Sequence, residues 1–376
     1  MENKKRILIT ATVVKTHIMQ FHIPVLKMFK EMGWETAVAS YNDYENKEEC
    51  QIPFCDRFYE LPFARNPFSK SNITAYKELS DIIKKERFDI IHCHTPVGGV
   101  ITRLAARNAR KNGTRVFYTA HGFHFFKGSS IKNWLLFYPA EMVCSYFTDA
   151  LITINSQDYG LAKRNFHAKE TVLVNGVGVD TRKIYESNPD KEAYRKELGL
   201  NSDDIMLFSI GELIERKNHK TIIKALSMLN NDNIYYVIAG SGTYYEDLYA
   251  LTKELGLEEK VHFLGYRRDA TQLLKTADVF CFPSYQEGLP VALIEAMSGG
   301  MAVVASRIRG TDELIDEGKG GYLYSPDDAS GFASGITKLI ENPELRDSFA
   351  SYNIEKAKKY DISIVSEQMK KIYFGR

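Results

Sequence analysis

The sequence predicts an α/β protein with two domains, each built on a parallel sheet, and three observations lead to this prediction. The chain has 376 residues, more than one ordinary hydrophobic core accommodates. Short apolar segments alternate with longer amphipathic segments, which is typical of βαβ units. A polar stretch at 188–204 interrupts this alternation, and the pattern then begins again. We therefore expect two α/β domains joined near this stretch.

Each half of the chain contributes its own set of expected strands and helices. In the first half, we expect strands at 6–11, 35–40, 90–94, 115–119 and 150–155, with helices that include 21–32 and 73–85. In the second half, we expect strands at 205–210, 235–239, 261–263, 279–282 and 301–305, with helices at 220–229, 245–255 and 290–298. The expected domains are 1–187 and 188–358, followed by a C-terminal helix at 359–376 that packs back toward the first domain.

The composition is that of a globular protein and excludes several functional classes. Hydrophobic residues make up 44% of the chain and charged residues 26%, which indicates neither a disordered chain nor a fibre. The 49 basic and 48 acidic residues leave a formal charge of +1, so no overall field attracts nucleic acid. The five cysteines are scattered, as in a reducing compartment. Because 6–14 is expected to form a strand rather than a signal peptide, we expect a cytoplasmic protein.

The segment 281–300, which reads CFPSYQEGLPVALIEAMSGG, is the most informative in the chain. A buried strand is expected to end near Phe282, and Pro290 lies in the first turn of an expected helix, where a missing amide has no cost. A helix N-terminus is a ready site for a diphosphate. Glu287 precedes this helix and Glu295 lies within it, so one carboxylate can reach a sugar while the other reaches a ribose. For Glu295 alone, a solvated helix face is the alternative.

The string EGLPVALIEAMSGG resembles the E-x7-E signature of a large family of retaining glycosyltransferases, family 4. That family has the GT-B fold, in which two facing Rossmann-like domains enclose an interdomain cleft, and the resemblance extends over nearly the whole chain. It implies that the first domain binds the acceptor and the second the nucleotide-sugar donor. It further implies that Glu287 contacts hydroxyls of the donor sugar and that Glu295 holds the ribose. From the expected helix start itself, Gly288, Leu289 and Pro290 are donor-binding candidates beside the diphosphate.

The loop 209–218 follows an expected strand and precedes an expected helix, which is the context of a phosphate-contacting loop. Arg216 and Lys217 are the candidates to stabilise the charge of a diphosphate leaving group. Basic side chains oppose the dipole at a helix N-terminus, so their presence favours an anionic partner over a solvated charge run. An arginine usually follows the position of Gly211 in the family, whereas this chain has Glu212 there. Either Arg216 supplies the missing cation or Lys217 acts alone.

Two further loops of the second half belong to the predicted donor site. Gly242 lies in a glycine loop after a strand, where the backbone can approach a ligand closely or simply turn the chain. By resemblance, this loop lies near the phosphates. Arg267 lies in a segment that resembles the one beside the nucleotide base, and the resemblance makes uridine the expected base.

The acceptor-side candidates follow strands of the first half. A neutral imidazole at His121 can donate a hydrogen bond to a sugar hydroxyl. By resemblance, His121 corresponds to the family's cleft histidine near the donor sugar, so we count it as a catalytic candidate. The loop after the first strand contains no glycine, unlike that of the family, and we expect Thr16 or His17 to face the acceptor. His94 is the other histidine expected to line the cleft.

The segment 123–147 is rich in aromatic and apolar residues and contains Lys127 and Lys132. One interpretation is a surface that meets a bilayer, with rings at the headgroup level and lysines on anionic lipid. The other, which we favour, is ordinary core plus a helix of the first domain. A membrane-binding surface would bring the protein to an acceptor saccharide linked to polyprenyl diphosphate, which is held in the bilayer. The protein would then act at the inner face of the cell membrane.

Together these features predict transfer of a hexose or N-acetylhexosamine from a nucleotide-diphosphate sugar to a saccharide or a lipid-linked saccharide, in bacterial surface or exopolysaccharide synthesis. Glu287 and Lys217 are expected to act in catalysis, and the resemblance implies retention of configuration. We expect no cofactor and no required metal, because basic residues can take the metal's role and no Asp-x-Asp cluster is suitably placed. A nucleotide-sugar epimerase and a non-catalytic sugar-nucleotide-binding protein are the alternatives. A dinucleotide oxidoreductase would need a G-x-G-x-x-G turn that the chain lacks.

Overall fold

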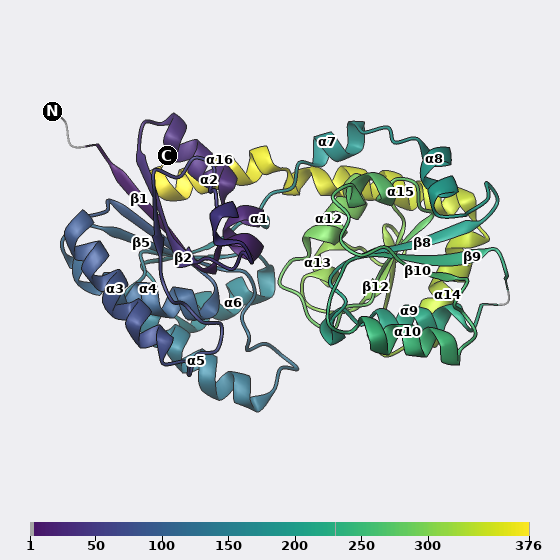
Figure 1. Ribbon diagram of the computed structural model, residues 1–376, viewed down its shortest axis with the longest axis horizontal. Helices are drawn as coiled ribbons and strands as arrows, with labels where there is room; N and C mark the ends of the chain where they lie inside the picture. The colour runs from purple at the N-terminus through teal and green to yellow at the C-terminus, as the bar shows by residue number, and fades with distance from the viewer. Residues whose placement is uncertain (1–3, 230, 376) are drawn as a thin grey trace. The chain divides into compact units, whose positions relative to one another are not determined.

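The computed structural model describes residues 4–229 and 231–375, which form two compact units. The first unit contains the chain up to Val174 and again from Ser366 onward, and the second unit is Asn175–Val365. Each unit is a parallel sheet with helices on both faces (Figure 1), so the predicted α/β architecture is confirmed. The second unit begins earlier than the expected position 188, because helix α7 (Thr181–Glu186) packs against α12 (Val291–Ser298).

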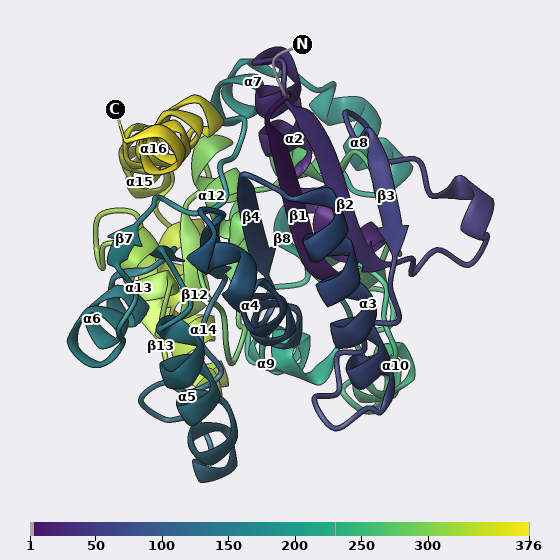
Figure 2. The same cartoon turned by 90° about the vertical axis from the view of Figure 1, so that its left-hand side faces the viewer.

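The sheet of the first unit has the strand order β3-β2-β1-β4-β5-β6-β7, and every pairing is parallel. Figure 2 shows β3, β2, β1 and β4 side by side. The five expected strands are present, and β3 and β7 are additional. The strands are β1 (Arg6–Val13), β2 (Glu35–Tyr41), β3 (Arg57–Glu60), β4 (Ile90–His94), β5 (Arg115–Ala120), β6 (Ala150–Thr153) and β7 (Glu170–Leu173).

Helices α3 and α4 cover one face of this sheet and α2 and α16 the other (Figure 1). Ala75 and Leu79 of α3 pack with Leu8 and Ile91 of the strands in one buried cluster. On the opposite face, the rings of Phe29 and Tyr373 lie 4.9 Å apart, which joins α2 to the C-terminal helix. The helical elements are η1 (Val14–Ile18), α1 (Met19–Phe21), α2 (Ile23–Glu31), η2 (Lys47–Glu49), α3 (Ser71–Glu86), α4 (Pro96–Lys111), α5 (Ile131–Ser145), α6 (Ser156–Asn165) and α16 (Ile362–Phe374).

The sheet of the second unit has the order β10-β9-β8-β11-β12-β13 and is also parallel. The five expected strands are again present, and β13 is additional at one edge. The strands are β8 (Ile205–Ile210), β9 (Ile234–Ala239), β10 (Val261–Phe263), β11 (Val279–Phe282), β12 (Val303–Ser306) and β13 (Gly321–Tyr324).

The second sheet is also covered on both faces. Helices α9, α10 and α14 lie on one side of it, and α12 and α15 lie on the other (Figure 1). Ile222 of α9 and Phe332 of α14 are fully buried in the cluster beneath β8 and β9. The helical elements are α8 (Lys191–Glu197), η3 (Glu215–Lys217), α9 (His219–Leu226), α10 (Tyr245–Glu254), α11 (Ala270–Leu274), α13 (Thr311–Leu314), α14 (Ala329–Ile340), α15 (Pro343–Ala357) and η4 (Lys358–Tyr360), besides α7 and α12.

The aromatic segment 123–147 contributes both core and surface. Phe123 and Phe125 are buried in a cluster that includes strand and helix residues of the first unit, as the favoured interpretation requires. The outer face of α5 leaves Ile131 and Leu135 exposed, at 77% and 74% of their surface. Among the described residues, no helix combines the length and the apolar character that a membrane span needs.

Candidate functional site

Lys217 and Glu287, the two predicted catalytic residues of the second unit, are in direct contact. The Lys217 ammonium lies 2.9 Å from Oε1 of Glu287, and Nη1 of Arg216 lies 2.8 Å from the same oxygen. The side chains of Lys217 and Glu287 are 14% and 12% exposed, whereas that of Arg216 is 40% exposed. Two cations therefore share one carboxylate, and the cluster keeps a net positive charge that attracts an anion.

The loop after β8 holds these cations in place through Asn218. This residue ends the short turn η3 in a left-handed conformation, with φ of 56°, which asparagine adopts more readily than most residues. Its buried Nδ2 donates to the carbonyl oxygens of Pro283 and Pro326, at 2.9 and 2.8 Å. Asn218 thereby ties the Lys217 loop to the loop that carries Glu287. Sequence reasoning missed it, although an asparagine directly before a helix is a recognisable signal.

The glycines of the donor loops allow two backbones to approach each other. A Cβ atom added at Gly242 would lie 2.3 Å from the carbonyl oxygen of Leu213, closer than any side chain tolerates. A Cβ atom on Gly211 would lie 3.4 Å from Cδ and Cε of Lys217, so the lysine stem rests against this glycine. The close contact between the loops after β8 and β9 accounts for a glycine at position 242. Of the two interpretations of this glycine, the structure thus favours a role in the path of the chain over an approach to a ligand.

The predicted diphosphate-binding turn lies at the start of α12. The helix begins at Val291 rather than at Pro290 as expected, because Pro290 has the extended ψ of 117° and precedes the first helical residue. Leu289 is buried, and Gly288 contacts Gly310 of the neighbouring loop. The predicted segment Gly288 to Pro290 therefore forms the entry to the helix, where unpaired amides favour an anion.

Arg309 is a further cation beside Glu287 that the sequence analysis did not select. Its side chain is buried, and Nε donates to the main-chain oxygen of Glu287 at 3.2 Å. The next residue, Gly310, has φ of +84°, and a Cβ atom there would lie 2.4 Å from the oxygen of Gly288. The Arg309-Gly310 turn thus supports the backbone of the Glu287 loop.

The Gly310→Ala variant is expected to lose far more stability than Gly318→Ala. Both glycines have positive φ, which costs an alanine about 1–2 kcal/mol. Only at Gly310 does the new methyl also collide with a main-chain oxygen, since no atom lies within 4 Å of a Cβ at Gly318. Thermal denaturation of the two purified variants measures the difference, and equal melting temperatures would show that the turn does not need this contact.

Glu295 is half-buried in α12, and within residues 4–229 and 231–375 its carboxylate has no hydrogen-bond or ion-pair partner. Burial raises the pKa of Glu295 to about 7. A carboxyl group held in this way is suited to accept hydrogen bonds from a ligand's hydroxyls, as the predicted ribose contact requires. The solvated helix face is less suitable as an explanation, because a solvated carboxylate would keep its ordinary pKa.

The pH dependence of stability should distinguish the wild type from Glu295→Gln. Between about pH 4.5 and 7 the folded protein keeps a proton on Glu295 that the unfolded chain has released. Wild-type stability should therefore fall as the pH rises through this window, by about 3 kcal/mol at most, relative to the variant. Chemical denaturation at several pH values measures this, with the exposed Glu258→Gln as the control. Parallel curves for wild type and E295Q would contradict the assignment.

Arg267, predicted beside the nucleotide base, is engaged by two carboxylates. Its Nε and Nη2 each lie 2.8 Å from an oxygen of Asp269, and Nη1 lies 2.6 Å from Glu197. These bonds use most of the donors of the guanidinium. Glu212, which occupies the place of the family's arginine, has an exposed side chain.

The acceptor-side candidates of the first unit gather after β1, β4 and β5. Nδ1 of His94 lies 3.2 Å from Nε2 of His121, and the ring centroid of His17 lies 4.9 Å from that of His121. Burial lowers the pKa of His121 to about 4 and holds the pKa values of His17 and His94 well below the usual range. These imidazoles are therefore neutral near pH 7. Thr16 instead bonds to Asp43, at 3.1 Å.

Sequence reasoning missed His22 and Thr95 in this region. The ring of His22 stacks on that of His94 at 3.7 Å, and His22 is buried between α1 and α2. Thr95 has φ of 64°, which is rare for a β-branched residue, and its Oγ1 lies 2.6 Å from that of Thr12. Strain of this kind concentrates at functional sites. A threonine after a strand gives no sign of it in the sequence.

Comparison with known proteins identifies the family. Residues 190–356 match the glycosyl transferases group 1 family model, and residues 6–155 match a glycosyl transferase 4-like model. EpsD of Bacillus subtilis strain 168, named as a glycosyltransferase, is 38% identical over 373 residues, or 98% of this chain and 96% of EpsD. The chain belongs to the glycosyl transferases group 1 family. It is therefore a glycosyltransferase, and the two alternatives, a nucleotide-sugar epimerase and a non-catalytic binding protein, are set aside.

Two further relatives of this group 1 glycosyltransferase extend the comparison. The Escherichia coli UDP-Gal:alpha-D-GlcNAc-diphosphoundecaprenol alpha-1,3-galactosyltransferase is 30% identical over 286 residues, covering 73% of this chain and 71% of that enzyme. The crystal structure of Anabaena HepE with UDP and glucose is 21% identical, covers 99% of this chain and 100% of HepE, and gives a TM-score of 0.83. This similarity confirms the predicted GT-B fold class.

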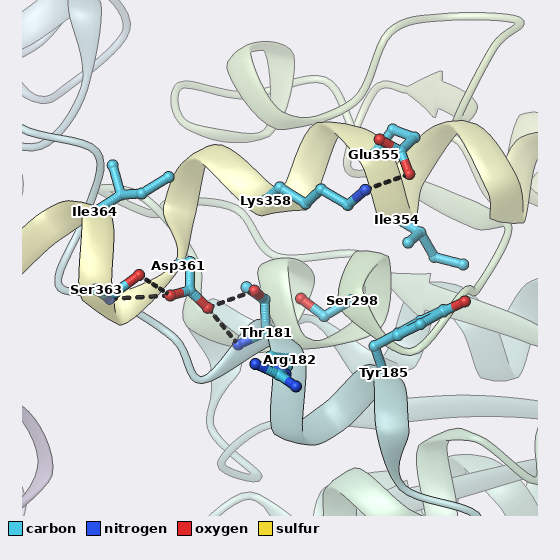
Figure 3. Close-up of a pocket in the computed structure, with 10 residues that line it drawn as sticks. All are labelled: Thr181, Arg182, Tyr185, Ser298, Ile354, Glu355, Lys358, Asp361, Ser363 and Ile364. Carbon is cyan, nitrogen blue, oxygen red and sulfur yellow. Dashed lines mark hydrogen bonds and ion pairs between the residues drawn. The ribbon is translucent and has the colours of Figure 1, made fainter.

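The second unit of this glycosyltransferase also contains a pocket of about 400 Å³ beside α7, α15 and the first turn of α16 (Figure 3). Within it, Asp361 accepts hydrogen bonds from the hydroxyl and the amide of Thr181, at 2.6 and 3.2 Å. Its lining includes none of the predicted site residues. Because its polar side chains bond to one another, we assign the pocket a structural role.

Proposed function

We propose that this glycosyltransferase transfers a hexose or N-acetylhexosamine from a UDP-sugar to a saccharide carried on polyprenyl diphosphate, in the assembly of a bacterial surface polysaccharide. The observation that carries the proposal is the contact of Lys217 and Arg216 with Glu287, since it joins cations for a diphosphate to a carboxylate for a sugar. Support comes from the relatives: the E. coli enzyme is named for a UDP-sugar and a diphosphoundecaprenol acceptor, and HepE was crystallised with UDP.

In the proposed reaction, the second unit holds the donor. Lys217, Arg216 and the amides at the start of α12 stabilise the departing UDP, whose charge develops as the glycosidic bond breaks. Glu287 orients the sugar through its hydroxyls, and Glu295 holds the ribose. The acceptor oxygen bonds to the anomeric carbon on the face that UDP leaves, and the acceptor's proton passes to the released phosphate oxygen. Configuration at the anomeric carbon is thereby retained.

The first unit presents the acceptor in this proposal. Neutral His121 donates a hydrogen bond to a sugar hydroxyl, with His17 and His94 beside it. Ile131 and Leu135 of α5 are exposed and would enter the interface of the inner membrane face, where Lys127 and Lys132 meet anionic headgroups. A lipid-linked acceptor would then reach the site without leaving the bilayer.

A donor panel followed by a transfer assay tests the proposed function. UDP-, GDP- and ADP-sugars are added to the purified protein, and we expect only UDP-sugars to raise its melting temperature. The protecting sugar, radiolabelled, is then offered to a polyprenyl-diphosphate-linked saccharide and to the same saccharide free, without added Mg²⁺ or Mn²⁺. We expect transfer to the lipid-linked acceptor. Protection by GDP- or ADP-sugars alone, or transfer only to the free saccharide, would contradict the donor or the acceptor.

A further inference from the structure

Four histidines of the first unit lie close enough together to share one ligand. They come from four separate places in the chain: the turn η1, the residue between α1 and α2, the end of β4, and the loop after β5. One ring nitrogen of each lies within 4.8 Å of those of the others, and the residues are His17, His22, His94 and His121. The chain thus brings four imidazoles together at the carboxyl ends of three neighbouring strands, where open parallel sheets bind their ligands.

Several nitrogens of this cluster are buried without a partner. Among residues 4–229 and 231–375, Nε2 of His17, His22 and His94 has no hydrogen-bond partner. Buried polar atoms are normally satisfied, and an unsatisfied one costs folding free energy. The neighbouring His92 shows the contrast, because its Nδ1 lies 2.5 Å from the hydroxyl of Tyr373 and its Nε2 lies 2.8 Å from that of Thr119. Three ring nitrogens of the cluster are therefore buried without a hydrogen-bond partner among the described residues, whereas both ring nitrogens of His92 have one.

The chemistry of the cluster selects the kind of ligand. Neutral imidazoles offer lone pairs, and four of them without a carboxylate suit Zn²⁺ rather than Mg²⁺ or Ca²⁺, which prefer oxygen. The distance of 3.2 Å between Nδ1 of His94 and Nε2 of His121 is close to the edge of a tetrahedron with zinc–nitrogen bonds, about 3.4 Å. Without an ion these two nitrogens share a hydrogen bond, which a common ion would replace, and Nε2 of His94 then stays outside the site.

We propose that the first unit binds one Zn²⁺ ion through ring nitrogens of His17, His22, His94 and His121. Binding draws the four nitrogens together and tilts the His22 ring away from its stack on His94. His17 and His121 are half-buried, so the cluster lies close to the surface of the first unit. The ion fixes the loop after β1 to the ends of β4 and β5. It has no part in stabilising the UDP leaving group, which Lys217 and Arg216 serve. A zinc-bound imidazole keeps its second ring N–H, so His121 can still donate a hydrogen bond to a sugar hydroxyl. The inference does not rest on the proposed function.

Metal analysis of the untagged, full-length protein tests the proposal. After dialysis against Zn²⁺ and then against metal-free buffer, we expect about one ion per chain by elemental mass spectrometry. Substituting Co²⁺ should give the visible absorption bands of a tetrahedral site. Loss of an outer hydrogen-bond partner of a metal ligand weakens metal binding by about 10- to 100-fold. The His17→Gln and His94→Gln variants lose a ligand itself, so their affinity for Zn²⁺ should fall by more than this. His167→Gln, an exposed histidine outside the cluster, should bind as the wild type does.

A second measurement keeps the test decisive if a variant folds poorly. Both tryptophans of the chain, Trp34 and Trp134, lie in the first unit, so their fluorescence reports its unfolding. Added Zn²⁺ should raise the melting temperature of wild type and H167Q, but not that of H17Q, which changes only a half-buried loop residue. Wild-type protein that retains no zinc, or H17Q and H94Q variants that bind and are stabilised like the wild type, would overturn the proposal.

Discussion

The Lys217→Ala variant is expected to lower the rate of sugar transfer by about 10²-fold or more, the cost of other lost contacts to a transition state. The substitution removes the less exposed of the two cations that contact the Glu287 carboxylate, where charge on the leaving UDP must be stabilised. Lys220→Ala is the matched control, because Lys220 follows on the adjoining helix and lies over the ring of Tyr285, 5.5 Å from its centre. Initial rates with radiolabelled donor measure both variants, and near-wild-type transfer by K217A would refute its catalytic role.

The Glu287→Ala variant separates binding from catalysis in the same cluster. Without the carboxylate, Lys217 and Arg216 lose the negative charge that they share, so the affinity for UDP itself should stay the same or rise. Turnover should fall by about 10²-fold or more, because the sugar is no longer oriented for attack. Calorimetric titration with UDP and rate measurements give the two quantities. A parallel loss of UDP affinity and turnover would mean that Glu287 acts by holding the loop together.

The sequence predicted the central strands and the edge strand β10, but missed the edge strands β3, β7 and β13. The strands at 205–210 and 279–282 are largely buried and mainly apolar, so they appear as nearly continuous hydrophobic runs. The edge strands β3 and β7 have no buried residue, and β13 begins with a glycine and is only half-buried. Such strands owe their existence to pairing with a neighbour rather than to their own composition.

In the candidate site, too, residues with a local sequence signal could be predicted, whereas residues that depend on distant contacts could not. The cations and carboxylates of the donor cluster could be selected because they lie next to glycines and prolines in recognisable turns. Arg309 could not, because it acts by bonding to a main-chain oxygen 22 positions away. The position of Asn218 before a helix is recognisable, but its main-chain partner 65 positions away is not. For the same reason His22 was missed, since only the folded loop after β1 brings it onto His94.

Helix α5 carries the exposed apolar residues of the proposed membrane surface, and a buried ion pair fixes it to the first unit. The side chains of Arg103 in α4 and Glu141 in α5 are 0% and 4% exposed, and their charged atoms lie 2.8 Å apart. The hydroxyl of Tyr118 donates to the other carboxylate oxygen at 3.0 Å, and the guanidinium lies over the Tyr118 ring. The carboxylate is thus the hub of a network that joins α4, α5 and β5.

The Glu141→Ala variant is therefore expected to destabilise the first unit by about 3–5 kcal/mol, since it leaves the Arg103 charge buried and uncompensated. An Arg103→Met, Glu141→Leu double variant should recover much of this loss, because apolar residues of similar size carry no charge to desolvate. Glu31→Ala, which breaks an exposed pair with Lys27, is the control and should change stability by less than about 1 kcal/mol. Urea unfolding followed by tryptophan fluorescence measures all three. If E141A were no less stable than E31A, the pair would not be what holds α5 in place.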